Sequence, residues 1–186
     1  MGYQVDAGWL REARRVDSPN FEARPPGAVP ELLVLHNISL PPGCYGTGCV
    51  ERFFTNCLDH SEHPFFAEIE GVRVSAHLLI ERNGGLVQFV DFSDRAWHAG
   101  ESSFEGRENC NDFSIGIELE GTDDEPYTGL QYFQLARVLP ALLAAYPALS
   151  AERIVGHSDI APGRKTDPGP AFDWRRLSDS LEGGST

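Results

Sequence analysis

Apolar runs along the chain predict the strands of a central sheet. Residues 31–36 contain four consecutive apolar residues, 32–35, which is typical of a strand buried on both faces. Residues 72–90 predict a hairpin, because apolar positions recur on both sides of the turn formers Asn83-Gly84-Gly85. Residues 113–120 alternate apolar positions with small or acidic ones, and 154–157 form a further short apolar run. We therefore expect four separate strand regions.

A helical repeat of apolar positions predicts the helices. The repeat is most regular over 135–146, for which Thr128 is a suitable N-cap, while Pro140 predicts a kink or a restart. A shorter repeat over 50–58 predicts a small amphipathic helix, and a last helical turn is expected near Trp174. Strands that alternate with helices predict an α/β fold, in which a central mixed β-sheet is flanked by helices.

Segments rich in proline, glycine and polar residues separate these elements. Residues 17–30 predict an extended lead-in to the first buried strand. Residues 41–71 are too long for an ordinary connection, so we expect one long lid-like loop or groove wall there. Residues 181–186 are expected to fray. The whole chain, 1–186, is therefore expected to form a single domain with one long excursion.

The composition argues against several classes of partner. The chain has 186 residues and a formal net charge of −13 at pH 7, and so acidic a surface repels the phosphates of nucleic acids and of anionic membranes. No apolar run approaches the roughly 18 residues that a membrane-spanning helix needs. The N-terminal residues do not resemble a signal peptide, and the four cysteines form no C-x-x-C pair. We therefore expect reduced thiols, a cytoplasmic location, and neither a nucleic-acid nor a membrane partner.

Two histidines and one aspartate are the strongest candidates for chemistry. His36 and His157 each end a predicted strand, and Asp167 lies in the loop that follows. Imidazole nitrogens and a carboxylate are good zinc ligands, and three protein ligands leave a fourth position for water. An alternative stays open, since a strand-end histidine is more often a hydrogen-bonded structural residue than a ligand. Asp167-Pro168 could equally be only the start of a turn.

Glu118 and Lys165 are the candidate catalytic partners of this site. Glu118 lies on the polar face of its strand with the small residues Ser114 and Gly116, which leave room for a group to approach the carboxylate. A carboxylate so placed is suited to act as general base and then as proton donor. Lys165 precedes Asp167 by two positions, so in an extended segment its ammonium would lie near the metal and could stabilise an oxyanion. A plain salt bridge between Glu118 and Lys165 is the alternative.

Five segments, in order along nearly the whole chain, resemble one enzyme family. They are GHSDIAPGRKTDPGPAFDW at 156–174, VLHNISLPP at 34–42, RVSAH at 73–77, RAWHAG at 95–100 and NDFSIGIELEGT at 111–122. These segments resemble the AmpD-type cytoplasmic 1,6-anhydro-N-acetylmuramoyl-L-alanine amidases. Those enzymes belong to the type 2 zinc amidases, a group that also contains phage lysozyme-type amidases and peptidoglycan recognition proteins.

The resemblance implies a ligand set and a reaction. It implies Zn²⁺ held by His36, His157 and Asp167, with Glu118 and Lys165 as catalytic residues. The bond cleaved would join the lactyl group of 1,6-anhydro-N-acetylmuramic acid to L-alanine of the stem peptide. The implied partner is therefore a small muropeptide, bound during cytoplasmic peptidoglycan recycling. We expect the protein to be a monomer.

Three further positions match residues that line the substrate groove of the family, namely Asn37, Arg73 and Trp97. Arg73 could pair with a carboxylate of the stem peptide, and Trp97 offers a flat apolar face. One departure is Asn109, which stands where members of the family often carry a second arginine. A second carboxylate contact is therefore expected to differ in this chain.

Two other functions are weighed against this one. A non-catalytic muropeptide-binding module would be expected to lack a metal ligand or the acid–base residue, whereas this chain has a candidate at every such position. A murein amidase that acts on intact cell wall would be expected to show an export signal or a wall-binding module, and the sequence predicts neither.

Overall fold

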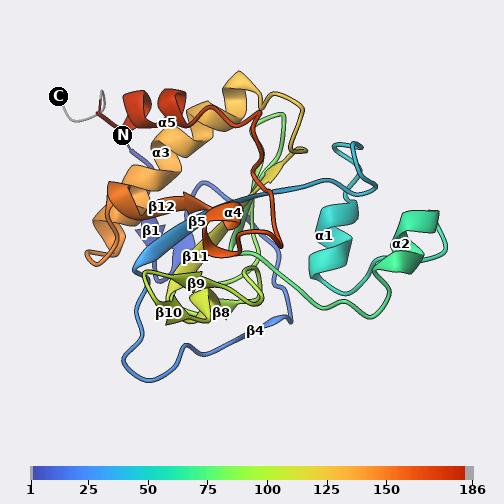
Figure 1. Cartoon of the computed structure of the whole chain (residues 1–186), viewed down its shortest axis with the longest axis horizontal. Coiled ribbons are helices and arrows are strands. Elements are labelled where there is room, and N and C mark those ends of the chain that lie inside the picture. Colours follow the sequence, from blue (N-terminus) through green and yellow to red (C-terminus); the bar gives the residue numbers. More distant parts are fainter. Residues whose placement is uncertain (1, 183–186) are drawn as a thin grey trace.

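The computed structural model describes residues 2–182, and its centre is one six-stranded sheet (Figure 1). The strands of this sheet are β3 (Arg14–Arg15), β5 (Leu32–Ile38), β6 (Leu78–Ile80), β7 (Leu86–Gln88), β11 (Ser114–Glu120) and β12 (Ile154–Gly156). Their order across the sheet is β12-β5-β11-β6-β7-β3. The first four are parallel neighbours, whereas β7 is antiparallel to β6. The sheet is therefore mixed, which confirms the predicted α/β fold class.

Helices cover the sheet and extend beyond it. The α-helices are α1 (Cys49–Phe54), α2 (Pro64–Glu68), α3 (Gly129–Ala145), α4 (His157–Ile160) and α5 (Trp174–Glu182). The smaller elements are 3-10 helices at Cys110–Asp112 and Ala151–Arg153, and ribbons of β1 (Val5–Asp6) with β2 (Trp9–Leu10), β4 (Phe21–Glu22) with β8 (Arg95–Ala96), and β9 (Ser103–Phe104) with β10 (Arg107–Glu108). Figure 1 shows α3 and α5 together beside the sheet, and α1 and α2 at the opposite end of the molecule. Within residues 2–182, no helix has the length and apolar character needed to cross a bilayer.

The alternating strand β11 shows why α3 packs where it does. Ile115, Ile117 and Leu119 on one face of β11 are buried in one apolar cluster with Leu135 and Leu142 of α3. Burying each such side chain contributes roughly 1.5–3 kcal/mol, so the matching periodicities of strand and helix hold the two elements together. The opposite face of β11 is thereby left to polar side chains, which form the site described below.

A second apolar cluster lies under the excursion at 41–71. Phe54 of α1 and Phe66 of α2 are buried in it against Phe89, which follows β7. The predicted helix at 50–58 is confirmed as the shorter α1, whereas α2 was not predicted. α2 is only five residues long and buries only Phe66, so its sequence carries no helical repeat.

α3 contains Pro140, the position of the expected kink or restart. The helix continues through this proline without a restart. Pro140 is exposed, whereas Leu139 and Leu142 on the other face stay in the core. The carbonyl group that loses its hydrogen-bond partner can therefore bond to water, while core packing holds the helix together. α3 ends at Ala145, before Pro147.

The backbone contacts correct the predictions for residues 72–90 and 17–30. The hairpin expected over 72–90 is shorter, because the backbone N–H of Ser75 donates to the carbonyl oxygen of Trp97 and so pairs away from β7. Residues 17–30 are more than an extended lead-in, since β4 within them pairs with β8. Arg24 donates from there to three backbone carbonyl groups behind the site. Residues 17–30 are thus joined to the rest of the structure by a strand pairing and by hydrogen bonds.

The C-terminal boundaries also differ from the prediction. The strand expected over 154–157 ends at Gly156, and His157 is the first residue of α4. The helical turn expected near Trp174 is confirmed and extends over Trp174–Glu182. Of the tail expected to fray at 181–186, the first two residues belong to α5, and 183–186 lie outside the described residues.

Replacing Thr128 with alanine is expected to lower the free energy of unfolding by about 1 kcal/mol. Thr128 forms a capping box with Gln131, and its hydroxyl also donates to the carbonyl oxygen of Arg82. The alanine variant leaves the Gln131 N–H without its cap. Urea unfolding of the two proteins measures the difference, and an unchanged midpoint would contradict the role of the cap.

Candidate metal centre and groove

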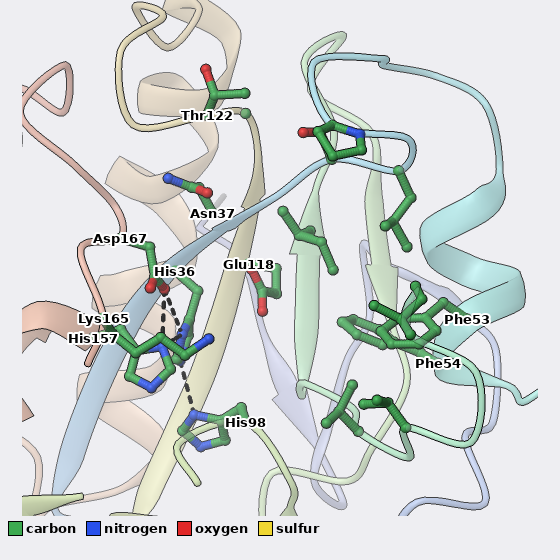
Figure 2. A pocket seen from close by; sticks show the side chains of 18 of the residues that line it. His36, Asn37, Phe53, Phe54, His98, Glu118, Thr122, His157, Lys165 and Asp167 are labelled. Atoms are coloured by element: carbon green, nitrogen blue, oxygen red, sulfur yellow. Dashed lines mark hydrogen bonds and ion pairs between the residues drawn. The ribbon is translucent and has the colours of Figure 1, made fainter. Parts of the chain in front are cut away.

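Three side chains meet at the carboxyl ends of two neighbouring parallel strands. His36 lies near the end of β5, and His157 directly follows β12. Because parallel strands end at the same edge of a sheet, both imidazoles reach one point, and the loop after α4 brings Asp167 to them (Figure 2). His36 Nδ1 lies 2.9 Å from His157 Nδ1 and 3.1 Å from Asp167 Oδ2. His157 Nδ1 lies 3.0 Å from the same oxygen.

These three atoms fit a divalent cation better than they fit one another. Two neutral imidazole nitrogens that face each other can share only one hydrogen, so a cluster held by hydrogen bonds alone is short of donors. Ligands at roughly 2.0–2.1 Å from a zinc ion in a tetrahedron lie about 3.3 Å apart, close to the observed separations. All three lie within 4.8 Å of one another. Two imidazoles and one carboxylate are a donor set for zinc with one position left open.

Burial and hydrogen bonding set the charges of these side chains. Burial lowers the pKa of His36 to about 4, so the ring is neutral near pH 7 and has a free nitrogen lone pair. Burial alone would raise the pKa of Asp167, but its side-chain contacts with His157 and His36 hold this pKa below its ordinary value. Neutral imidazole and charged carboxylate are the forms that bind a metal ion.

A backbone contact determines which ring nitrogen of His157 faces the site. His157 Nε2 lies 3.0 Å from the carbonyl oxygen of Ala99, so Nε2 carries the hydrogen and Nδ1 is free to act as a ligand. Ala99 is held in turn by Asn111, whose Oδ1 accepts from the backbone N–H groups of Ala99 and His98. The segment at 98–99, which the sequence pattern does not assign to the site, therefore helps to build it.

The ring of His98 occupies the space that the small residues of β11 leave. Its Nδ1 lies 2.9 Å from His36 Nε2, and its Nε2 lies 3.1 Å from Ser114 Oγ. A Cβ atom at Gly116 would lie 2.4 Å from Cγ of His98, so a larger residue there would displace the ring. The small face therefore accommodates a histidine, and not, as the sequence suggests, a group that approaches Glu118.

Glu118 lies beside the three candidate ligands. The register of β11 against β5 sets Glu118 opposite His36, and its side chain points into the same pocket (Figure 2). It is only 8% exposed, and its Oε2 has no hydrogen-bond partner. Burial, helped by the charge of Asp167, raises the pKa of Glu118 well above its ordinary value. A buried carboxyl group beside the candidate ligands is suited to take up a proton and to release it.

Lys165 lines the exposed side of the same pocket, next to His157 (Figure 2). After burial and Asp167, its charge is the third influence on the pKa of Glu118, which it lowers. Within residues 2–182, no contact of ion-pair length joins Lys165 to Glu118, so the alternative of a plain salt bridge does not hold. The ammonium group of Lys165 therefore lies near the site without forming an ion pair with Glu118.

A groove with a cavity volume of about 560 Å³ opens over these residues. The candidate ligands, Glu118 and Lys165 form one side of it. Figure 2 shows Phe53 and Phe54 on the opposite side, where the 41–71 excursion supplies an apolar wall. A volume between roughly 300 and 1,000 Å³ is typical of small-molecule sites. The groove thus offers a charged side for chemistry and an apolar side for binding.

The three expected substrate contacts take different positions. Asn37 and Trp97 both line the groove. Asn37 Nδ2 donates to Asp123 at 2.7 Å, and Trp97 Nε1 donates to Glu22 at 3.2 Å, so each is fixed by a carboxylate. Arg73 is exposed and lies outside the groove, at an adjoining hollow of about 80 Å³. The substrate roles of these residues stay predictions.

Asn109, the position expected to depart from the family pattern, also lies outside the groove. It borders a separate hollow of about 450 Å³. Arg164 lines both this hollow and the groove, and its guanidinium donates to the carbonyl oxygens of Ala99 and Glu101. Asn109 therefore shares a hollow with Arg164 that contains none of the three candidate ligands.

Several known proteins are similar to this chain in sequence and in fold. Residues 26–170 match the family model described as N-acetylmuramoyl-L-alanine amidase. The chain is 61% identical, over 92% of its length and 91% of the other, to the 1,6-anhydro-N-acetylmuramyl-L-alanine amidase AmpD of Salmonella typhimurium strain SL1344. A crystal structure of a selenomethionine AmpD derivative matches with a TM-score of 0.93 and 58% identity, covering 95% of this chain and 98% of that one. The AmpDh3 structure from Pseudomonas aeruginosa, in complex with anhydromuramic pentapeptide, matches with a TM-score of 0.61 and 29% identity, covering 89% and 65%.

Proposed function

Because this chain belongs to the N-acetylmuramoyl-L-alanine amidase family, we propose how its groove performs the reaction of that family. The chain hydrolyses the amide bond between the lactyl group of 1,6-anhydro-N-acetylmuramic acid and L-alanine of the stem peptide, the activity for which its Salmonella relative is named. One observation carries the placement of this reaction. The facing atoms of His36, His157 and Asp167, separated by 2.9–3.1 Å, lie beside the buried Glu118, whose Oε2 has no partner.

We infer that the three ligands hold a zinc ion. A bound zinc ion supplies a Lewis acid for the amide carbonyl group and lowers the pKa of water toward about 7. His36 and His157 would bind it as neutral imidazoles, and Asp167 would add one negative charge. The ion with its three ligands would then keep one positive charge, which suits an amide oxygen that becomes negative during attack.

Glu118 moves the proton. Its unpartnered Oε2 takes a proton from the attacking water as that water bonds to the amide carbon. The same carboxyl group then donates this proton to the nitrogen of L-alanine as the carbon–nitrogen bond breaks. Lys165, on the exposed side, stabilises the negative charge on the former carbonyl oxygen. The products are a free lactyl carboxylate and a free peptide amine.

The two sides of the groove indicate how the substrate lies. The amide must reach the charged side, so the sugar and the peptide extend along the groove past Asn37 and Trp97. Trp97 presents a flat apolar face, and Asn37 presents its amide oxygen because its nitrogen is bonded to Asp123. Arg73 at the rim is left to pair with a peptide carboxylate. We propose a monomer that acts on small muropeptides in the cytoplasm.

Hydrolysis of soluble anhydro-muropeptide is expected to proceed much faster than release of peptide from intact sacculi. The measurement is chromatography of the products from both substrates, with and without a chelator that removes zinc. Activity that the chelator abolishes and zinc restores supports the metal assignment. Binding without hydrolysis would favour the non-catalytic binding module, and equal rates on both substrates would favour the murein amidase of intact wall. Activity indifferent to the chelator would contradict the zinc proposal.

A further inference from the structure

His36 has polar contacts at both of its ring nitrogens. Nδ1 faces His157 and Asp167, while Nε2 lies 2.9 Å from Nδ1 of His98. The His36 and His98 rings meet edge to face, with their planes at 82° and their centroids 5.0 Å apart. His98 is therefore directly behind His36 as seen from the candidate metal position (Figure 2).

The positions of the hydrogens follow from the roles of these nitrogens. A neutral imidazole carries one ring hydrogen, so a His36 that gives its Nδ1 lone pair to a cation must carry its hydrogen on Nε2. That hydrogen points at His98 Nδ1, which must then accept. The hydrogen of His98 is thereby placed on Nε2, 3.1 Å from Ser114 Oγ. A single arrangement satisfies the whole chain of contacts from His36 to Ser114.

The ring of His98 is itself held in place from three directions. Its backbone N–H donates to Asn111 Oδ1 at 3.1 Å, and Ser114 Oγ meets its Nε2. Gly116 lies under the ring, where any Cβ atom would collide with it. His98 is 9% exposed. Within residues 2–182, the side chains able to share a metal ion are His36, His157 and Asp167, and His98 is not among them. Both of its nitrogens are occupied, so it is not a fourth ligand.

We propose that His98 is a positioning residue of the metal centre, one that holds His36 in the tautomer and ring orientation that present Nδ1 to the cation. The proposal rests on the zinc site proposed above. Partners of this kind behind a ligating histidine typically change metal affinity by about 10–100-fold when they are removed. His98 acts here through His36 and does not need to touch the substrate.

Replacing His98 with leucine is expected to lower the affinity for Zn²⁺ by about 10–100-fold. Leucine fills similar space but offers no acceptor to His36 Nε2. His98→Asn is expected to retain most of the affinity, because the side-chain oxygen of asparagine can lie where Nδ1 of histidine lies. Competition with a chromogenic chelator measures Zn²⁺ affinity. The visible absorption of bound Co²⁺ gives a second readout, which reports the geometry of the ligands and is expected to change in His98→Leu alone.

Gln88→Leu provides the matched control. Gln88 is a buried polar residue with hydrogen bonds to Leu10, Gly8 and Val90, away from the groove, so its variant also loses stability but is expected to bind Zn²⁺ normally. Unchanged affinity in His98→Leu would overturn the proposal, and so would equal losses in the leucine and asparagine variants. If the leucine variant does not fold, a tenfold or greater loss in the asparagine variant overturns it. Failure of the unaltered protein to bind Zn²⁺ would instead refute the zinc site itself.

Discussion

Replacement of Glu118 with glutamine is expected to lower turnover by about 10²–10⁴-fold while leaving metal binding intact. Glutamine has the shape of glutamate but cannot take up the proton of the attacking water or return it to the leaving nitrogen. Glu118 does not belong to the group of side chains that can share an ion, so the ligands are unchanged. The measurement is the initial rate on anhydro-muropeptide, together with the zinc content of the purified variant.

Glu120 offers a matched control for this experiment on the same strand. It is buried like Glu118, but its oxygens accept from the backbone N–H groups of Gly46 and Arg82. The Glu120→Gln variant keeps an oxygen acceptor and is expected to keep most of its turnover. If Glu118→Gln turns over as fast as the unaltered protein, Glu118 is not the proton carrier. If both variants lose activity equally, the effect comes from packing on β11.

Replacement of His157 with alanine is expected to abolish both zinc binding and hydrolysis. Only His36 and Asp167 then remain as ligands. Removing a residue that is hydrogen-bonded to a ligand lowers metal affinity by about 10–100-fold, and removing a ligand itself is expected to lower it further. Alanine is also a strong helix former, so α4 is expected to keep its conformation. Zinc content by elemental analysis and the rate on anhydro-muropeptide measure the two effects in the same preparation.

His63→Ser is the control for the loss of one imidazole. His63 is exposed in the excursion and caps α2 by accepting from Phe65 N, a role that serine performs well. This variant is expected to bind zinc and turn over normally. A His157→Ala protein with unchanged zinc content would show that the ion is held elsewhere, and the proposed mechanism would then be wrong.

The sheet could be predicted because its strands bury long apolar faces. The residues at 31–36 and 113–120 carry the full pattern of a core strand, and the helix after Thr128 carries the full pattern of a core helix. The candidate ligands could be predicted from their place at the ends of β5 and β12, together with the family resemblance. The structure brings these three together, as the hypothesis requires, although the roles of the residues stay predictions.

The remaining features depend on contacts between distant segments, which a local pattern does not contain. His98 has no periodicity of its own, and its place beside His36 depends on Asn111 and on the absence of a side chain at Gly116. Its presence in RAWHAG was the one available signal. α2 gives no signal in the sequence because one buried residue makes no repeat, and whether α3 restarts at Pro140 depends on how the helix packs.

The two sides of the groove pack into different apolar clusters. The face of β11 that meets α3 belongs to one apolar cluster, whereas the wall from 41–71 packs into another, which also includes Leu79 of β6 and Val87 of β7. Changes in Phe53 or Phe54 therefore act first on a cluster that contains none of the three candidate ligands. Substitutions in this wall can therefore alter which substrate binds without replacing any of the three candidate ligands.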